Sequence, residues 1–269
     1  MIYLNIFQDF IFAIIQALLE WFPVSSEGFI VLTAINVFGD TAENAIRIAI
    51  WFHLGTAIAV FIKYRKTYYD AFFKDRTLLR MLFLSVLGTA VIGIPLYFLL
   101  NDIFSVLNGM VVTLIIGVTL AITATFLRFG KLKGSETKTI ENRKVGDELA
   151  LGIAQGFAIL PGISRSGTTM TYLILRGYKK EDAFKISFLI SLPAVLAAIA
   201  FDFLITVVID NEPIGFSWYY LILMGFVTVI GYFMMDFLLK FAKKYSFDII
   251  CYFLSAFTIG LAIIYFIFI

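Results

Sequence analysis

The stretch PGISRSGTT, from Pro161 to Thr169, interrupts an otherwise apolar region over residues 149–175. A second interruption, QALLEWFPVSSEG, runs from Gln16 to Gly28 inside the apolar region 6–38. Proline ends a helix and glycine tolerates tight turns. Each stretch therefore predicts two half-length helices joined by a polar turn, and these two broken segments decide the fold.

The rest of the chain consists of apolar runs that are long enough to cross a bilayer. Of 269 residues, 61% are hydrophobic and 15% are charged, against roughly 45–50% and 25% in soluble proteins. The runs are continuous, unlike the alternating segments of a membrane β-barrel. About 20 apolar residues span the hydrocarbon core as a helix. We therefore predict an all-α membrane protein with two re-entrant hairpins and six transmembrane helices near 44–62, 78–100, 106–127, 182–205, 217–239 and 248–268.

Basic residues are unevenly placed between these runs. The connections near 101–105 and 206–216 contain no Lys or Arg, whereas those near 63–77 and 128–148 are rich in both. By the positive-inside rule the basic connections are cytoplasmic, which predicts a multi-pass protein of the plasma membrane. The predicted orientation rests on the basic residues Lys63, Arg65, Lys66, Lys74, Arg76, Arg128, Lys131, Lys133, Lys138, Arg143, Lys144, Arg176, Lys179, Lys180, Lys240, Lys243 and Lys244.

The two halves of the chain match each other at one fixed offset. We predict a single transmembrane domain over 1–269 with a first repeat, 1–127, and a second repeat, 149–269. Each repeat has one hairpin, 6–38 or 149–175, and three spanning helices, so the second repeat is inverted relative to the first. In many transporters the breaks of such repeats meet near the midplane and bind ligand. The matching pairs include Pro23 with Pro161, Ser26 with Ser164, Ala45 with Ala183 and Leu54 with Leu192.

The first break carries carboxylates at membrane depth. Gln16 and Glu20 are four residues apart and share a helix face. A buried carboxylate such as Glu20 usually marks a functional site, and the alternatives are a structural partner for Arg165 or a helix cap. Glu27 is either functional or a favourable cap at the start of a half-helix.

The second break has the composition of a phosphate site. Arg165 offers a guanidinium that matches phosphate oxygens, and a helix that begins here offers free N–H groups and partial positive charge. Gly167 allows close approach of the backbone. We predict anion binding, with a structural ion pair as the alternative, and the hydroxyl groups nearby belong to Ser164, Ser166, Thr168 and Thr169.

The remaining polar residues give weaker signals. His53 is the only histidine and would be the default general base, but no titratable residue is close in sequence, so a structural role is favoured. Gln155 either orients a ligand or joins helices, and for Asp202 an interfacial location is favoured over proton relay. The small, dispersed net charge of +2 excludes the basic footprint of a nucleic-acid binder. The single cysteine, Cys251, excludes an internal disulfide.

At these motifs the chain resembles the undecaprenyl-diphosphate phosphatase family, the bacitracin-resistance type of membrane phosphatase. PGISRSGTT matches the PGxSRSGxT motif of that family, and QGFAILPG, FKISFLISLPA and WFHLGTAIAV extend the resemblance. The first family motif, ExxxE followed by a proline, serines, a glycine and a histidine, is matched only in part. Glu20, Pro23, Ser25, Ser26 and Gly28 agree, whereas Gln16 and Phe29 replace the first glutamate and the histidine.

The resemblance implies removal of the terminal phosphate from a polyprenyl diphosphate, which gives the monophosphate carrier of envelope glycan assembly. Glu20 would be the catalytic or metal-directing carboxylate, and Ser26 matches the serine proposed as nucleophile. Because Phe29 replaces the histidine, a Ser–His mechanism is not assumed. The diphosphate would be held by Ser164, Arg165, Ser166 and Thr169, with Gln16, Ser25, Glu27 and Gly167 as further substrate-binding residues.

A metal route is compatible with these departures. Mg²⁺ or Ca²⁺ would bind Glu20, with Glu27 and the Gln16 side-chain carbonyl as further oxygen donors beside the substrate phosphate. The rival hypothesis is a carrier that flips a polyprenyl monophosphate through the same Arg165 site. The expected partners are the polyprenyl diphosphate and the bilayer, without nucleic acid, and homodimer formation is left open.

Overall fold

The computed structural model of the protein describes residues 6–104, 107–133, 137–142, 144–209, 218–242 and 245–268. Over these residues the chain is almost wholly helical, and the only β-type pairing is one isolated bridge between Lys138 and Tyr178. Six helices are long and apolar enough to cross a membrane, which confirms the predicted all-α class. They are α3 (Ala42–Phe73), α4 (Arg76–Phe104), α5 (Gly109–Lys133), α8 (Lys180–Phe203), α9 (Tyr219–Phe241) and α10 (Phe247–Phe268).

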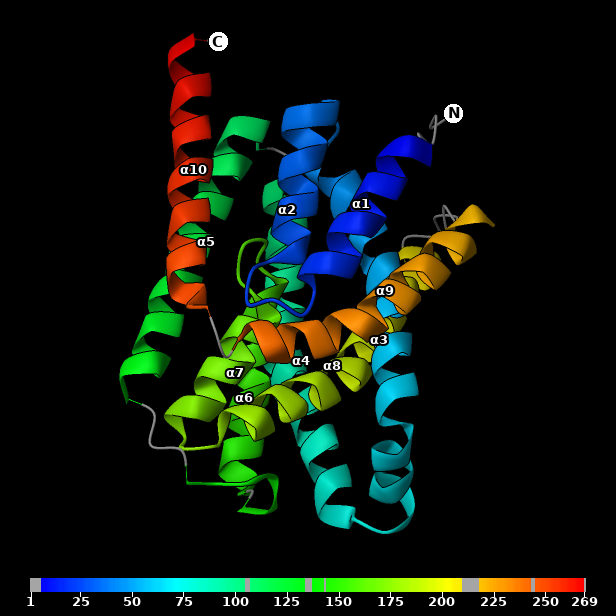
Figure 1. The fold of residues 1–269 in the computed structure, drawn as a ribbon. Helices are drawn as coiled ribbons and strands as arrows, with labels where there is room; N and C mark the ends of the chain where they lie inside the picture. The colour runs from blue at the N-terminus through cyan, green and yellow to red at the C-terminus, as the bar shows by residue number, and fades with distance from the viewer. Residues whose placement is uncertain are drawn as a thin grey trace.

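The two broken segments form at the expected places. The first consists of α1 (Ile6–Leu19) and α2 (Ser26–Thr33), and α2 continues as the π-helical turn η1 (Ala34–Phe38). In Figure 1, α1 and α2 lie side by side and the turn between them points into the middle of the molecule. The second consists of α6 (Val145–Gly156), the 3₁₀ turn η3 (Phe157–Ile159) and α7 (Arg165–Leu175), preceded by the short turn η2 (Ile140–Asn142).

The same capping sequence starts the second half-helix of each broken segment. The Ser25 hydroxyl accepts a hydrogen bond from the Gly28 amide at 3.1 Å, and the Ser164 hydroxyl accepts one from the Gly167 amide at 3.1 Å. A serine N-cap satisfies an amide that has no partner within the helix. The two halves thus share a local motif, but its equivalent residues are Ser25 and Ser164, one position away from the predicted pairing of Ser26 with Ser164. The inverted relation of the halves stays a prediction.

The helices extend further than the apolar runs predict. The connection expected at 63–77 begins with a kink of α3 at Tyr64, whose φ of −109° and ψ of 20° are not helical, but beyond it the chain is helical again to Phe73, and α4 begins at Arg76. Lysine and arginine are good helix formers, so a charged flank need not end a helix. Likewise α8 continues as the π-helical turn η4 (Leu204–Ile209). Parts of the predicted topology, namely Arg143, Lys243, Lys244 and most of the 206–216 connection, lie outside the described residues.

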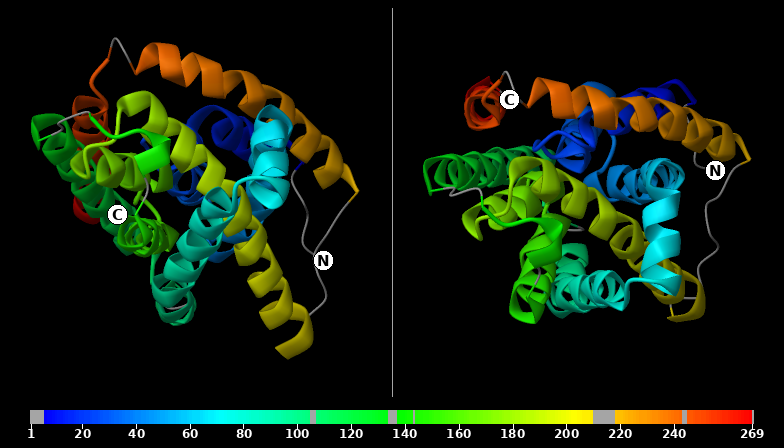
Figure 2. Two further views of the ribbon diagram at one scale, coloured as in Figure 1. Left: turned by 90° about the horizontal axis from the view of Figure 1, so that it is seen from below. Right: turned by 60° about the horizontal axis from the view of Figure 1, so that its bottom comes forward.

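Helices from the first half of the chain pack against helices from the second half. The closest pairs are α5 with α10, α4 with α6, and α3 with α9, and Figure 1 shows α5 and α10 side by side. Both views in Figure 2 show α9 along one side of the bundle. One apolar cluster is centred on Trp21 and Phe188 and another on Phe12, Phe52 and Tyr220. Both clusters join residues from the two halves of the chain.

Pro193 creates a vacant acceptor within α8. A proline has no N–H, so the carbonyl four residues earlier loses its helical hydrogen bond. That carbonyl belongs to Leu189, and it accepts a hydrogen bond from the Tyr68 hydroxyl at 2.7 Å. Because Tyr68 lies on α3, this contact fixes α3 against α8 beside the polar centre described next.

Candidate active site at the junction of the two hairpins

The turns of the two hairpins meet inside the bundle. The Ser25 hydroxyl, which caps α2, also accepts a hydrogen bond from the Gly162 amide of the other turn at 3.0 Å. The Ser166 hydroxyl donates to the Phe22 carbonyl at 2.7 Å. A Cβ atom on Gly28 would lie 2.9 Å from the Gly162 nitrogen, so glycine is needed for this approach.

Helix α5 supports the second turn from behind. The Thr119 hydroxyl donates to the Pro161 carbonyl at 2.6 Å, and the Thr123 hydroxyl donates to the Gly162 carbonyl at 3.2 Å. Gly162 has a positive φ of 95°, a conformation that side chains with a Cβ rarely adopt. These contacts place the start of α7, with Arg165, directly opposite the first turn.

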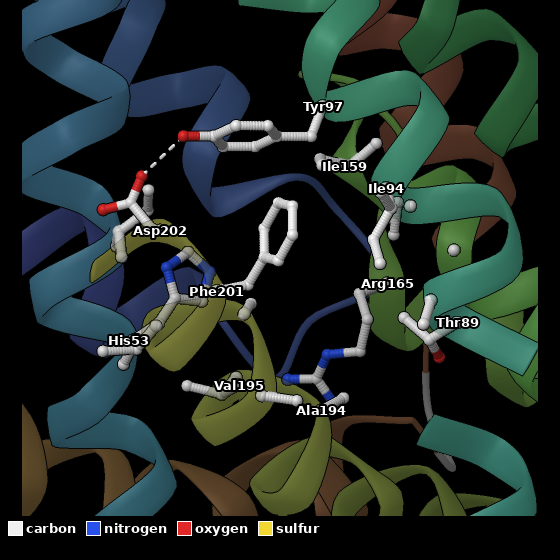
Figure 3. Close-up of a pocket in the computed structure, with 18 of the residues that line it drawn as sticks. His53, Thr89, Ile94, Tyr97, Ile159, Arg165, Ala194, Val195, Phe201 and Asp202 are labelled. Carbon is white, nitrogen blue, oxygen red and sulfur yellow. Dashed lines mark hydrogen bonds between the residues drawn. The ribbon is translucent and has the colours of Figure 1, made fainter. Parts of the chain in front are cut away.

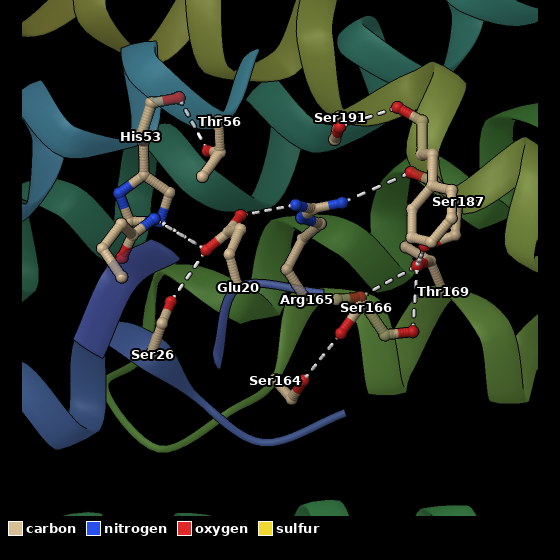
Figure 4. A network of polar contacts seen from close by, with 12 residues as sticks. Glu20, Ser26, His53, Thr56, Ser164, Arg165, Ser166, Thr169, Ser187 and Ser191 are labelled. Carbon is tan, nitrogen blue, oxygen red and sulfur yellow. Dashed lines mark hydrogen bonds and ion pairs between the residues drawn. The ribbon is translucent and has the colours of Figure 1, made fainter. Parts of the chain in front are cut away.

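Glu20 is the centre of the polar network (Figure 4). Its Oε1 accepts a hydrogen bond from Arg165 Nη2 at 2.6 Å, which is the ion pair predicted from the sequence as the alternative to ligand binding. Its Oε2 accepts hydrogen bonds from Ser26 Oγ at 2.7 Å and from Gln16 Nε2 at 2.8 Å. The residue is 6% exposed. His53 Nε2 also lies 3.4 Å from Oε2. Arg165, Ser26, Gln16 and His53 therefore surround one buried carboxylate.

The Arg165 guanidinium is held in place by further contacts. Nη1 donates to the Ser187 carbonyl at 3.3 Å, and the guanidinium lies 5.9 Å from the centroid of the Trp21 ring. Behind it, the hydroxyl groups of Thr169 and Ser187 are 2.7 Å apart. A planar guanidinium fixed in this way can present several donors to phosphate oxygens.

Only some of the predicted site residues line the small polar pocket at this junction. Glu20, Ser25, Ser26, Glu27, Ser164 and Arg165 line it. The other predicted residues do not line it: Gln16 bonds to Glu20, Ser166 to Phe22, and Thr169 to the Arg165 carbonyl. Gly167 packs near Pro23, where an added Cβ would come within 3.2 Å of the proline ring.

A larger, mostly apolar cavity of about 420 Å³ adjoins the polar pocket. Its walls come chiefly from α3, α4 and α8, and Figure 3 shows Arg165 and His53 pointing into it. On the wall away from Arg165, the Tyr97 hydroxyl donates to Asp202 at 2.9 Å. The volume is within the range of about 300–1,000 Å³ that is typical of small-molecule sites.

The structure gives the surroundings of three further polar residues. His53 lies beside Glu20, because α3 passes the first turn, and its structural role stays a prediction. Asp202 lines the large cavity, and its interfacial location stays a prediction. Gln155 donates to Thr89 at 2.9 Å, which joins α6 to α4, and it also lines the large cavity, so both of its predicted roles stay open. No local sequence signal predicts the His53 contact, since it depends on tertiary packing.

Phe29 occupies the position of the family histidine but does not face the carboxylate network. Its ring packs against the apolar cluster formed by Val24, Ala124 and Cys251. The only histidine of the chain, His53, contacts Glu20 from α3 instead.

The residues at the junction suit a hard cation only in combination with a ligand. Over the part of the chain that the structure describes, no three His, Cys, Asp or Glu residues form a metal-binding cluster. Glu20 and Glu27 line the same pocket, and Gln16 Oε1 is buried without a hydrogen bond. Mg²⁺ is commonly held by one or two carboxylates plus substrate phosphates, and Glu20 with Glu27 fits that pattern. Gln16 does not line the pocket and turns its Nε2 toward Glu20, so its Oε1 does not complete the set.

The fold and the site define an integral membrane protein with a buried arginine–carboxylate centre beside an apolar cavity. The chain belongs to the bacitracin resistance protein BacA family, whose model matches residues 9–261. It is 38% identical to an undecaprenyl-diphosphatase of Methanothrix thermoacetophila over 255 residues, which cover 94% of this chain and 96% of the relative. It is 34% identical to an undecaprenyl-diphosphatase of Methanococcoides burtonii, with 92% and 95% covered. A relative of the same name from Thermodesulfovibrio yellowstonii is 28% identical, with 97% and 98% covered.

Proposed function

We propose that this protein is a membrane phosphatase that hydrolyses a polyprenyl diphosphate of the undecaprenyl type to the monophosphate and inorganic phosphate. The observation that carries the proposal is the contact of Glu20 with both Ser26 and Arg165 next to an apolar cavity. The names of the relatives in the BacA family support the same substrate class.

The two adjoining pockets suit the two parts of such a lipid. The diphosphate head group would lie at the hairpin junction, where Arg165 and the amide groups at the start of α7 attract phosphate oxygens. The isoprenoid tail would lie in the apolar cavity between α3, α4 and α8. The proposed active form is a multi-pass protein of the plasma membrane, and homodimer formation stays an open expectation.

Ser26 and Glu20 have the spacing of a nucleophile and its base, 2.7 Å between Oγ and Oε2. In the proposed reaction Glu20 accepts the Ser26 proton while Oγ bonds to the terminal phosphorus. The bond from that phosphorus to the bridging oxygen breaks, and the prenyl monophosphate leaves with the electron pair. Water then releases inorganic phosphate from the serine, and Arg165 stabilises charge on the transferred group.

A bound Mg²⁺ or Ca²⁺ belongs to this proposal as a cofactor. Glu20 and Glu27, which line the same pocket, would hold it together with substrate oxygens. When bound, it would supply positive charge beside the phosphoryl group.

The experiment is phosphate release from a C55 prenyl diphosphate by the purified protein in detergent, with Mg²⁺, Ca²⁺ or EDTA. We expect release that needs the cation and that disappears in Glu20→Gln. Glu141→Gln is the matched control, because Glu141 is an exposed carboxylate in η2. Failure of the wild-type protein to release phosphate, while prenyl monophosphate still binds, would refute the enzyme proposal and favour a lipid-phosphate carrier.

A further inference from the structure

His53 lies at the passage between the polar pocket and the apolar cavity. Four residues line both spaces, namely Glu27, His53, Ala158 and Arg165. Of these, only Arg165 and His53 carry side-chain N–H groups. The His53 side chain is 20% exposed, so it is accessible from the cavity while packed against the hairpin turn.

The ring of His53 is oriented so that both nitrogens face acceptors. Nδ1 lies 2.7 Å from the Ala49 carbonyl of the preceding helical turn, and Nε2 lies 3.4 Å from Glu20 Oε2. The contact with Ala49 fixes the ring, and Nε2 is the ring nitrogen on the side of Glu20 and the polar pocket.

Arg165 and His53 approach Glu20 from opposite sides. Arg165 contacts Oε1 from α7, and His53 contacts Oε2 from α3, as Figure 4 shows. Glu27 lies on the same passage and opposes an anion there. A phosphate in the passage therefore needs donors on both sides, and these two residues are the groups placed to provide them.

A prenyl diphosphate has two phosphates, and the proposed function places only the terminal one beside Ser26. With the tail in the apolar cavity, the prenyl-linked phosphate has to lie in the passage between the two spaces. We propose that His53 binds this second phosphate through Nε2, opposite Arg165, and thereby determines the preference for prenyl-linked phosphates over free phosphate. The inference rests on the proposed function.

The experiment compares His53→Leu with His53→Gln in the full-length protein, because the glutamine amide places a donor near the position of Nε2. Loss of a hydrogen bond to a charged group predicts that kcat/KM for prenyl diphosphate falls about tenfold or more in His53→Leu. Binding of prenyl monophosphate weakens to a similar extent, whereas binding of inorganic phosphate changes less than about twofold. His53→Gln recovers most of the loss, and Glu141→Gln behaves as the wild type does.

Two results would overturn the inference. One is an unchanged kcat/KM in His53→Leu, and the other is an equal loss of inorganic phosphate binding, which would show that His53 only positions Glu20. If His53→Leu does not fold, His53→Asn replaces it, because the asparagine amide reaches only to the position of Nδ1. If the wild-type protein releases no phosphate, the proposed function fails, and the comparison of prenyl monophosphate with inorganic phosphate still tests His53.

Discussion

Glu20 competes with any bound phosphate for the same guanidinium. Its Oε1 lies 2.6 Å from Arg165 Nη2, and Arg165 is the cation that faces the polar pocket. A phosphate that binds Arg165 has to replace part of this contact. Glu20→Gln removes the charge while it preserves the size of the side chain, so we predict that the variant binds phosphate more tightly and no longer hydrolyses the lipid.

The size of both effects follows from the contacts. A hydrogen bond to a charged group contributes about 1.5–3 kcal/mol, and each 1.4 kcal/mol is about tenfold in affinity. Freed from Glu20, Arg165 is expected to bind phosphate roughly tenfold to a hundredfold more tightly. Loss of the base lowers kcat by about 10²–10⁴-fold. Without ligand, the free energy of unfolding of the variant should fall by about 3 kcal/mol, because a buried ion pair is broken. This value is the lower end of the usual range, since the Arg165 side chain is 16% exposed and keeps some contact with its surroundings.

The assay is thermal unfolding of the purified protein in detergent across a titration of inorganic phosphate, combined with phosphate release from the prenyl diphosphate. Glu20→Gln should start with a lower midpoint and show a larger upward shift with phosphate than the wild type shows. Equal or weaker phosphate binding by the variant would refute the competition between Glu20 and phosphate. Normal hydrolysis by the variant would refute the role of Glu20 as base.

Three further predictions test neighbouring features. Ser26→Ala should abolish phosphate release, whereas Ser25→Ala should keep it at a reduced level and lower the free energy of unfolding by about 1 kcal/mol as a lost cap; the reverse pattern would exclude Ser26 as nucleophile. Gly162→Ala should destabilise the fold more than Gly39→Ala does, although both glycines have a positive φ. A Cβ added at Gly162 would lie 1.9 Å from the Thr119 hydroxyl, whereas a Cβ added at Gly39 meets nothing within 4 Å. Equal unfolding midpoints of the two variants would contradict this. Tyr68→Phe should lower the free energy of unfolding by about 1–3 kcal/mol, since it leaves a buried carbonyl unpaired, and no change in a thermal melt would count against that account.

The centre of the site follows from the sequence because buried charges need partners. Glu20 and Arg165 each lie in a short interruption of an apolar region, and an isolated charge at that depth is costly. Their pairing can therefore be predicted once the two hairpin turns are expected to lie next to each other inside the bundle. The caps are predicted less exactly, because the fixed offset pairs Ser26 with Ser164, whereas the structure caps the two half-helices with Ser25 and Ser164.

Other features depend on tertiary packing and leave no local signal. The contact between His53 and Glu20 depends on the rotation of α3 about its axis, which the sequence does not encode because the apolar residues of α3 are not confined to one face. The position of Asp202 in the cavity wall depends in the same way on the packing of α8 against α4. The end of α3 at Phe73 depends on how far a charged flank continues the helix into water, which composition alone does not determine.

The hydrogen bonds across the hairpin junction also restrict how the protein can move. The bonds from the Gly162 amide to Ser25, from Ser166 to Phe22 and from Arg165 to Glu20 all join the first turn to the second. Two neutral bonds and one charged bond together contribute about 2.5–6 kcal/mol, so separated turns are populated on the order of one molecule in a hundred or fewer. A rocking cycle of the kind used by inverted-repeat transporters would have to overcome this in every turnover, whereas hydrolysis at a closed junction does not.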